Sequence, residues 1–241
     1  MRIASIWRHP VKAIGREALP SVALRAGEGL PGDRRWAVTH ENTRETGPGW
    51  ARKANFLRGV SGPQLMAVTA ESAGDRVTLR HPDRPDLTVA PEADAAALVD
   101  WLGPLWPDDL PRPTGVAACA TGFTDVPDPW VSINFEASHR AVAQKLGRDL
   151  SIHRWRGNLW LAGAGPWTEF DLVGRRFAIG EVVFEGRQAI TRCKATMANP
   201  ETGRRDADTL GALRDFGHQQ FGLYAEVVEG GTLSPGMALA A

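Results

Sequence analysis

Cys193 is the residue whose surroundings point most directly to chemistry. It closes the strand-like segment 188–193 and stands between Arg192 and Lys194. Cationic neighbours favour the thiolate over the thiol, and the thiolate is the form that binds soft metals or attacks sulfur. From the residues alone a second interpretation stays open, in which Cys193 is a small buried side chain near surface cations.

Cys119 is the only other cysteine, and its neighbours in 116–121 are small and mostly apolar. We therefore interpret Cys119 as structural. Two cysteines are too few for a thiolate-bound iron–sulfur cluster, a cysteine-based structural zinc site or a disulfide framework. Any iron–sulfur cluster that passes electrons to this chain must belong to another protein.

The other short motifs in the chain indicate turns rather than sites. Gly27, Gly29 and Gly32 have the spacing of the dinucleotide-binding fingerprint, but Pro31 interrupts it and a strand pattern follows where a helix is required. The sequence has no P-loop, no H-E-x-x-H and no G-x-S-x-G. The six histidines are scattered singly, without the spacing of metal ligands.

Composition indicates an ordinary globular protein. The 241 residues are 43% hydrophobic and 23% charged, with a mean hydropathy of -0.25. No apolar run approaches the length of about 18 residues that a membrane helix needs, and Arg2, Arg8 and Lys12 interrupt the start, so we expect a cytoplasmic protein without a membrane partner. Because 28 basic residues balance 28 acidic ones, we expect no nucleic-acid partner, although a local basic pocket stays possible.

Short alternating segments separated by glycine and proline predict a mainly β protein. Such frequent strands favour barrels or sandwiches over a doubly wound α/β fold, because strands joined by turns cannot form parallel crossovers. The predicted strands are 2–7, 21–24, 35–39, 65–69, 76–80, 86–89, 150–154, 158–161, 175–179, 181–185, 188–192 and 223–228.

A few helices complete the pattern. Apolar residues recur at helical spacing in 93–102 and 135–146, and Asn134 is the candidate N-cap of the second. Asp208 is the candidate cap of a third helix. The proline-rich stretch 103–129 lacks periodicity and predicts a linker or a long surface loop.

Three stretches of the C-terminal half together resemble one known family. The residues T-R-C-K-A-T-M-A-N-P-E-T-G at 191–203, F-G-L-Y at 221–224 and G-G-T-L-S-P-G at 230–236 are similar to the MOSC domain, named for the C-terminal domain of molybdenum cofactor sulfurases. Met237 stands where the family usually has an acidic residue.

Two upstream stretches resemble the β-barrel domain that precedes MOSC in many members. These are H-P-V-K at 9–12 and G-D-R-R-W at 32–36. The resemblance implies a mainly β fold with a few helices, arranged as two β-barrel-like domains. We expect the N-terminal domain to span 1–106 and the MOSC domain 107–241.

This two-domain form is similar to molybdenum enzymes that reduce N-hydroxylated compounds, such as the mitochondrial amidoxime-reducing component. The resemblance implies a molybdenum cofactor (Mo-molybdopterin), a small-molecule substrate and an external electron-donor protein of ferredoxin or cytochrome type. Cys193 would bind molybdenum as the catalytic residue. The implied cofactor-binding residues are Lys12 and Arg34 at the phosphate end, Arg156 and Asn158 at the pterin, Arg192 and Thr196 at the edge of the metal, and Ser132 and Asn134 as further donors.

Departures from the family pattern leave alternatives open. Ala13 replaces a serine of the amidoxime-reducing relatives, and Ala241 ends the chain without the ferredoxin domain of some bacterial relatives. A cofactor carrier, or a sulfur-transfer module with a Cys193 persulfide, would need the same thiolate but no turnover. A third alternative is a binding module for another phosphorylated ligand, with a structural Cys193. The stretch 43–62 is either a wall of the site or a plain surface loop.

Overall fold

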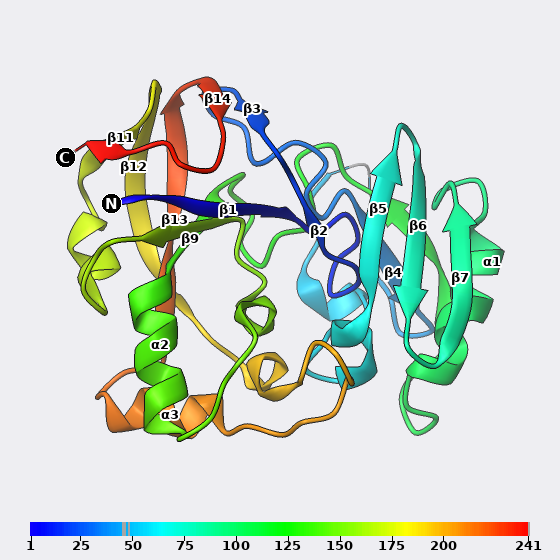
Figure 1. The fold of residues 1–241 in the computed structure, drawn as a ribbon. Helices are drawn as coiled ribbons and strands as arrows, with labels where there is room; N and C mark the ends of the chain where they lie inside the picture. Colours follow the sequence, from blue (N-terminus) through cyan, green and yellow to red (C-terminus); the bar gives the residue numbers. More distant parts are fainter. Residues whose placement is uncertain (45–46, 48, 241) are drawn as a thin grey trace.

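A computed structural model describes residues 1–44, 47 and 49–240 of the chain. Its largest sheet has eight strands in the order β15-β11-β12-β13-β9-β10-β1-β2 (Figure 1). In that order the strands are Leu239–Ala240, Arg176–Ile179, Val182–Thr191, Gln220–Glu229, Val131–Phe135, Leu159–Ala162, Arg2–Arg8 and Glu17–Ala18. The outer strands β15 and β2 do not pair with each other within the described residues, but an antiparallel bridge from Arg2 to Ala238 joins β1 to the segment that leads into β15.

Strands β9 and β10 of this sheet are parallel, and the α-helix α2 (Glu136–Lys145) lies between them in the chain. The helix α2 lies within the predicted helical range 135–146 and supplies a crossover long enough to return the chain to the same end of the sheet. Elsewhere in the sheet, β12 pairs antiparallel with β13, and β1 pairs antiparallel with β10.

The N-terminal half forms a second group of smaller sheets. The strands β5 (Thr69–Ala73), β6 (Arg76–His81) and β7 (Arg84–Val89) make an antiparallel sheet beside α1 (Ala95–Leu102), as the right-hand side of Figure 1 shows. A further pair joins β4 (Trp36–His40) with β8 (Pro113–Ala118), whereas β3 (Val22–Leu24) and β14 (Gly231–Leu233) pair with each other and pack into the core of the eight-stranded sheet. None of the described helices is long and apolar enough to cross a membrane.

Two main hydrophobic cores lie under these sheets. One gathers apolar side chains of the eight-stranded sheet, including Ile3, Ile133 and Leu223. The other gathers side chains of the N-terminal half, such as Leu79 and Leu102. Burial of these side chains is the main source of stability for each half, and it confirms the mainly β fold with a few helices.

The chain crosses between the two groups at several places. Strand β1 belongs to the C-terminal sheet although it begins the chain, and β8 pairs with β4 of the N-terminal half. Strand β8 also lies inside the proline-rich stretch predicted as a linker or loop, where a strand was not expected. The domain boundary between 106 and 107 stays a prediction.

Several element predictions are wrong for local reasons. Residues 65–69 overlap a 3-10 helix at Pro63–Ala67, where Pro63 fixes a helical φ at the start. Residues 150–154 overlap a 3-10 helix at Ile152–Trp155, because the Ser151 side chain accepts a hydrogen bond from the His153 N–H and turns the chain. The predicted strands 181–185 and 188–192 form one bulged strand, β12.

The predicted helices are present, but one predicted cap is wrong. Asp208 caps α3 (Thr209–Asp215), since its side chain accepts a hydrogen bond from the Gly211 N–H. Asn134 is not an N-cap, because it lies within β9 and Phe135 precedes the first turn of α2 without a side-chain cap. A position in a central strand leaves the Asn134 amide free for tertiary contacts.

Candidate functional site

A single pocket of about 380 Å³ brings residues of both halves together beside Cys193. Its lining contains seven basic side chains and one carboxylate, that of Asp125. The basic side chains are Lys12, Arg34, Lys53, Arg58, Arg154, Arg156 and Arg192. Although the whole chain has no net charge, the pocket concentrates positive charge and suits an anionic ligand.

Eight of the nine side chains predicted for the site line this pocket. They are Lys12, Arg34, Ser132, Arg156, Asn158, Arg192, Cys193 and Thr196. Asn134 does not line it. Lys12 and Thr196 are 184 residues apart in the chain, yet the motifs quoted from the sequence meet at one place.

Among the residues that the structure describes, three of the four non-glycine residues with a left-handed backbone also line the pocket. The φ angles are 63° at Ala13, 51° at Arg34 and 49° at Arg156. The left-handed region costs L-residues free energy, and such strain collects at functional sites when the surrounding contacts over-determine the conformation. The tertiary structure therefore holds these three positions against their local preference.

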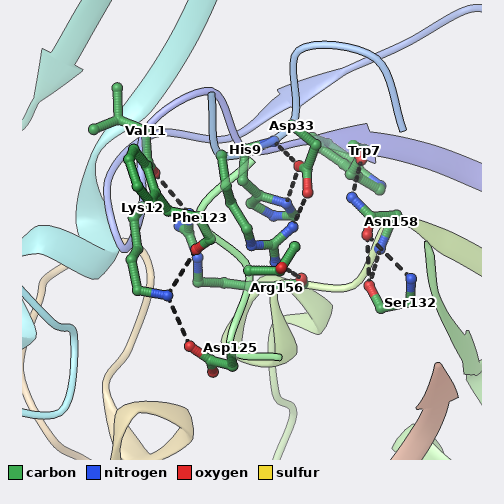
Figure 2. A network of polar contacts seen from close by, with 12 residues as sticks. Trp7, His9, Val11, Lys12, Asp33, Phe123, Asp125, Ser132, Arg156 and Asn158 are labelled. Atoms are coloured by element: carbon green, nitrogen blue, oxygen red, sulfur yellow. Dashed lines mark hydrogen bonds and ion pairs between the residues drawn. The ribbon is translucent and has the colours of Figure 1, made fainter. Parts of the chain in front are cut away.

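Arg34 is held by one carboxylate and one backbone carbonyl. Its guanidinium pairs with Asp33 and donates from Nη2 to the Arg156 carbonyl at 2.8 Å. Asp33 also accepts a hydrogen bond from the His9 N–H at 2.7 Å (Figure 2). Burial by itself would raise the pKa of Asp33, but Arg34 and His9 outweigh it and hold that pKa well below its usual value.

Lys12 and Asp125 form an ion pair at another part of the wall. The Lys12 Nζ donates to Asp125 Oδ1 and to the Phe123 carbonyl, each at 2.8 Å (Figure 2). Burial lowers the pKa of Lys12, and Asp125 opposes that effect. Burial would raise the pKa of Asp125, yet Lys12 brings it down to about 2. Asp125 is thus ionised at neutral pH, and the Lys12 ammonium has one proton without an acceptor in the described structure.

The Arg192 guanidinium donates hydrogen bonds to neutral acceptors. It donates from Nε to the Phe221 carbonyl at 2.9 Å, from Nη1 to the Trp155 carbonyl at 2.7 Å and from Nη2 to Asn134 Oδ1 at 3.0 Å. The Trp155 and Phe221 rings stack at 3.7 Å, and the Arg192 guanidinium carbon lies 5.7 and 5.6 Å from their centres. Asn134 therefore acts behind the pocket, as a positioning residue for Arg192.

Arg156 and Arg192 carry charge that no contacting carboxylate balances among the described residues. The Arg156 guanidinium donates to the carbonyls of Gly15 at 3.1 Å and Val11 at 3.3 Å. Burial, helped by Arg34, lowers the pKa of Arg156 to about 9, and burial lowers that of Arg192 to about 10. Both stay charged at neutral pH, so an anion in the pocket would gain from them.

The remaining polar side chains mostly bond to one another. Ser132 Oγ donates to Asn158 Oδ1 at 2.7 Å and accepts from the Asn158 N–H at 2.9 Å, and the Asn158 amide donates to the Trp7 carbonyl (Figure 2). Thr196 Oγ1 bonds to the Cys193 carbonyl at 3.0 Å and to Thr209. These hydrogen bonds hold the wall of the pocket in place. We therefore expect a ligand to contact chiefly the basic side chains and Cys193.

Cys193 lies at the C-terminal end of β12, before a 3-10 helix at Lys194–Met197. Its side chain is exposed and borders the pocket, whereas Cys119 is buried beside Phe56 and Phe123. Within the described residues no three histidine, cysteine or acidic side chains gather as a metal site. A metal in this pocket would therefore need donors from its own ligand besides the Cys193 thiolate.

Comparison with family models finds a match for each half of the chain. The model of the MOSC domain matches residues 123–240, and that of the MOSC N-terminal beta barrel domain matches residues 1–104. The chain belongs to the MOSC domain family. The two matches confirm the predicted fold class and place Cys193 in the MOSC region and Lys12 and Arg34 in the region that precedes it.

Curated relatives match part of the MOSC chain. Over 101 residues it is 34% identical to a molybdenum cofactor sulfurase of Caenorhabditis briggsae and 32% identical to that of Caenorhabditis elegans. The match covers 40% of this chain and 14% of either relative, so this chain corresponds to only about one seventh of their length. They support an association of the MOSC region with molybdenum-cofactor proteins.

A solved structure shares the fold over nearly the whole MOSC chain. The YUAD protein of Bacillus subtilis has a TM-score of 0.50 at 12% identity, with 99% of this chain and 93% of that chain covered. At this identity the likeness shows the fold alone.

Several pocket residues were not predicted from the sequence. They include Lys53, Arg58, Arg154, Asp125 and Tyr224. The stretch 43–62 contributes Lys53 and Arg58, so it does form one wall, although positions 45, 46 and 48 lie outside the described residues. The basic residues Arg52, Lys53 and Arg58, close together in the chain, were the available signal. Tyr224 offered a weaker one, as the only tyrosine of the chain.

Proposed function

We propose that this MOSC protein holds a molybdenum cofactor through Cys193 and reduces N-hydroxylated compounds. One observation carries the proposal: an exposed thiol borders a pocket whose lining has seven basic side chains and one carboxylate. The reductase activity itself is an inference from the site together with the family.

The donor set of the pocket fits this cofactor. Molybdenum cofactor is a pterin dithiolene with a terminal phosphate, so it requires several cations for its anionic ends and one soft ligand for the metal. Arg156 and Arg192 are buried cations without a contacting carboxylate in the described structure, and Cys193 is the only exposed thiol. A neutral ligand would leave those two charges uncompensated.

The assignment of individual residues follows the family motifs and the geometry. Lys12 and Arg34 would hold the phosphate end, Arg156 and Asn158 the pterin, and Cys193 the metal. Arg192 and Thr196 would lie at the edge of the metal. Ser132 and Asn134 support Asn158 and Arg192 respectively through the hydrogen bonds already described.

The cofactor, when bound, supplies a two-electron reduction in which R–NH–OH, two electrons and two protons give R–NH2 and water. The protein's own task is to orient the cofactor and the substrate and to exclude water from the pocket. Tyr224 lines the pocket, and burial together with Asp125 raises the pKa of its phenol, which is therefore a neutral donor at physiological pH. The electrons would come from an external donor of ferredoxin or cytochrome type.

The deciding experiment combines composition and turnover. The protein is purified from a host that makes molybdenum cofactor, and its molybdenum and pterin contents are measured. Turnover of an amidoxime or a hydroxylamine is then followed with a chemical reductant. We expect one molybdenum per chain and reduction of the substrate. Absence of molybdenum and pterin, from a host in which a known molybdenum enzyme is filled, would overturn the proposal.

A second candidate is a sulfur-transfer or cofactor-carrier role. Two observations favour it: the Cys193 thiol is exposed, and the curated relatives are named molybdenum cofactor sulfurases. In that role Cys193 would carry a persulfide or the cofactor would be held without turnover. Mass spectrometry that finds one extra sulfur on Cys193, together with no reduction of N-hydroxylated compounds, would favour this candidate over the reductase.

A further inference from the structure

Two segments that contribute to the pocket wall carry six basic side chains, which we call the rim cations. They come from two segments, 52–58 and 194–205, and are Arg52, Lys53, Arg58, Lys194, Arg204 and Arg205. All are exposed except Arg58, which is half-buried. Segment 52–58 contains no acidic residue, and segment 194–205 contains only Glu201.

The two segments meet in space beside Cys193. Arg205 Nη2 donates to the Val60 carbonyl at 2.6 Å. A Cβ built on Gly59 would lie 3.5 Å from Ala195 Cβ, two residues after Cys193. Lys53 and Arg58 line the pocket together with Cys193. The two segments that carry the rim cations therefore meet at the wall of the pocket that contains Cys193.

The rim cations differ from other exposed arginines in their lack of partners. Among the described residues none of the six forms an ion pair, whereas Arg80, Arg140 and Arg187 each pair with a glutamate. The one carboxylate that lines the pocket, that of Asp125, is engaged by Lys12. Positive charge thus accumulates at one place on a chain that has no net charge.

We propose that the rim cations are the docking surface for an acidic electron-donor protein. This proposal rests on the proposed reductase function, which needs a supply of electrons. The two cysteines are separate and too few to hold an iron–sulfur cluster, so the electrons must come from another protein. Four of the six cations lie outside the pocket lining, so they are spread too widely for one small anion. A macromolecular partner with an acidic surface would cover them and would bring its redox group close to Cys193.

The test uses charge reversal away from the pocket lining. Arg52→Glu/Arg204→Glu reverses two rim cations, and Arg25→Glu/Arg175→Glu makes the same charge change at two exposed arginines outside the rim. The probe is an acidic [2Fe–2S] ferredoxin. Its dissociation constant is measured by titration calorimetry at low and physiological ionic strength, and its KM is measured in turnover of an amidoxime. Reduced methyl viologen replaces it in parallel assays.

We expect the rim variant to bind ferredoxin about tenfold more weakly at low ionic strength, and the control variant to bind like the unaltered protein. Salt should weaken binding of the unaltered protein, because exposed charges are screened. Methyl viologen turnover should be equal in all three proteins. Equal ferredoxin binding by the rim variant, an equal loss in both variants, or tighter binding of a short DNA duplex than of ferredoxin would overturn the proposal.

Failure of the proposed function would look different. A protein without molybdenum and without turnover on methyl viologen would refute the reductase. Turnover with methyl viologen, together with a KM for ferredoxin that is the same in the rim variant and the unaltered protein, would instead support the reductase and reject the docking surface.

Discussion

Arg34 Nη2 donates a hydrogen bond to the backbone carbonyl of Arg156 at 2.8 Å, across 122 residues of sequence. Both residues have a left-handed backbone and both line the pocket. The bond therefore joins the turn after Gly32 in the N-terminal half to the turn that precedes β10 in the MOSC region. The charged wall of the pocket exists only when the two halves are packed together.

Removal of the Cys193 thiol should separate metal binding from folding. Cys193→Ala should retain the thermal unfolding midpoint of the unaltered protein, because an exposed side chain contributes little burial. It should contain no molybdenum and show no turnover. Metal analysis and thermal unfolding measured on the same sample check this, and unchanged metal content would contradict the assignment.

Cys119 provides the matched control for that variant. Cys119→Ser places a hydroxyl among the buried Phe56 and Phe123 side chains, so we expect a loss of about 1–2 kcal/mol in the free energy of unfolding. Molybdenum content and activity should be unchanged, since Cys119 lies outside the pocket lining. A loss of metal equal to that of Cys193→Ala would contradict the assignment of Cys193 as the metal ligand.

Gly157 should tolerate no side chain. A Cβ on Gly157 would lie 1.4 Å from Asn134 Nδ2, so Gly157→Ala must displace Asn134 and with it the hydrogen bond to Arg192. We expect a loss of about 2–3 kcal/mol in the free energy of unfolding, in the range for overpacking of a tight site, and a loss of cofactor.

Gly103→Ala is the control for the glycine substitution. Gly103 has a helical backbone with φ of -46°, and a Cβ there would meet nothing within 4 Å. The free energy of unfolding should stay the same or rise by about 0.5 kcal/mol, because alanine reduces the freedom of the unfolded chain. Chemical denaturation of both variants gives the comparison, and equal destabilisation would refute the steric argument.

Because of Asp33, the free energy of unfolding should decrease as the pH falls into the acid range. The folded pKa of Asp33 is held below the ordinary value of 3.8, so its carboxylate contributes stability that is complete above pH 5 and lost as the pH falls. Asp33→Asn should therefore cost about 3 kcal/mol at pH 7, the scale for a broken buried ion pair. The difference from the unaltered protein should shrink below about pH 4. Denaturation at a series of pH values checks it, and a difference that grows in acid would contradict it.

Arg192 should not be replaceable by lysine. Its guanidinium satisfies the carbonyls of Trp155 and Phe221 and the Asn134 amide at once, and a lysine ammonium has neither the reach nor the planar fork for all three. We expect Arg192→Lys to lower the free energy of unfolding by about 2 kcal/mol. Denaturation of Arg192→Lys and Arg192→Met should give similar losses, and full stability of the lysine variant would show that charge alone matters.

Much of the fold was predictable where local pattern decides it. The alternation in β6 and the Asp208 cap of α3 are local features, and the structure has both. Strand β8 was missed because its proline-rich surroundings suggest a loop, whereas pairing with β4 stabilises it as a strand. Such pairing joins residues distant in the chain and has no local signature.

The sequence by itself determined part of the pocket lining. The motifs at 9–12, 32–36 and 191–203 contain Lys12, Arg34, Arg192 and Cys193, all of which line the pocket. Only the tertiary structure decided how they act, because the role of a side chain depends on which neighbours it meets. Asn134 looks like a helix cap in sequence, yet it lies in β9 and positions Arg192. Lys53 and Arg58 look like surface cations, and packing of the two halves brings them into the lining of the pocket with Cys193.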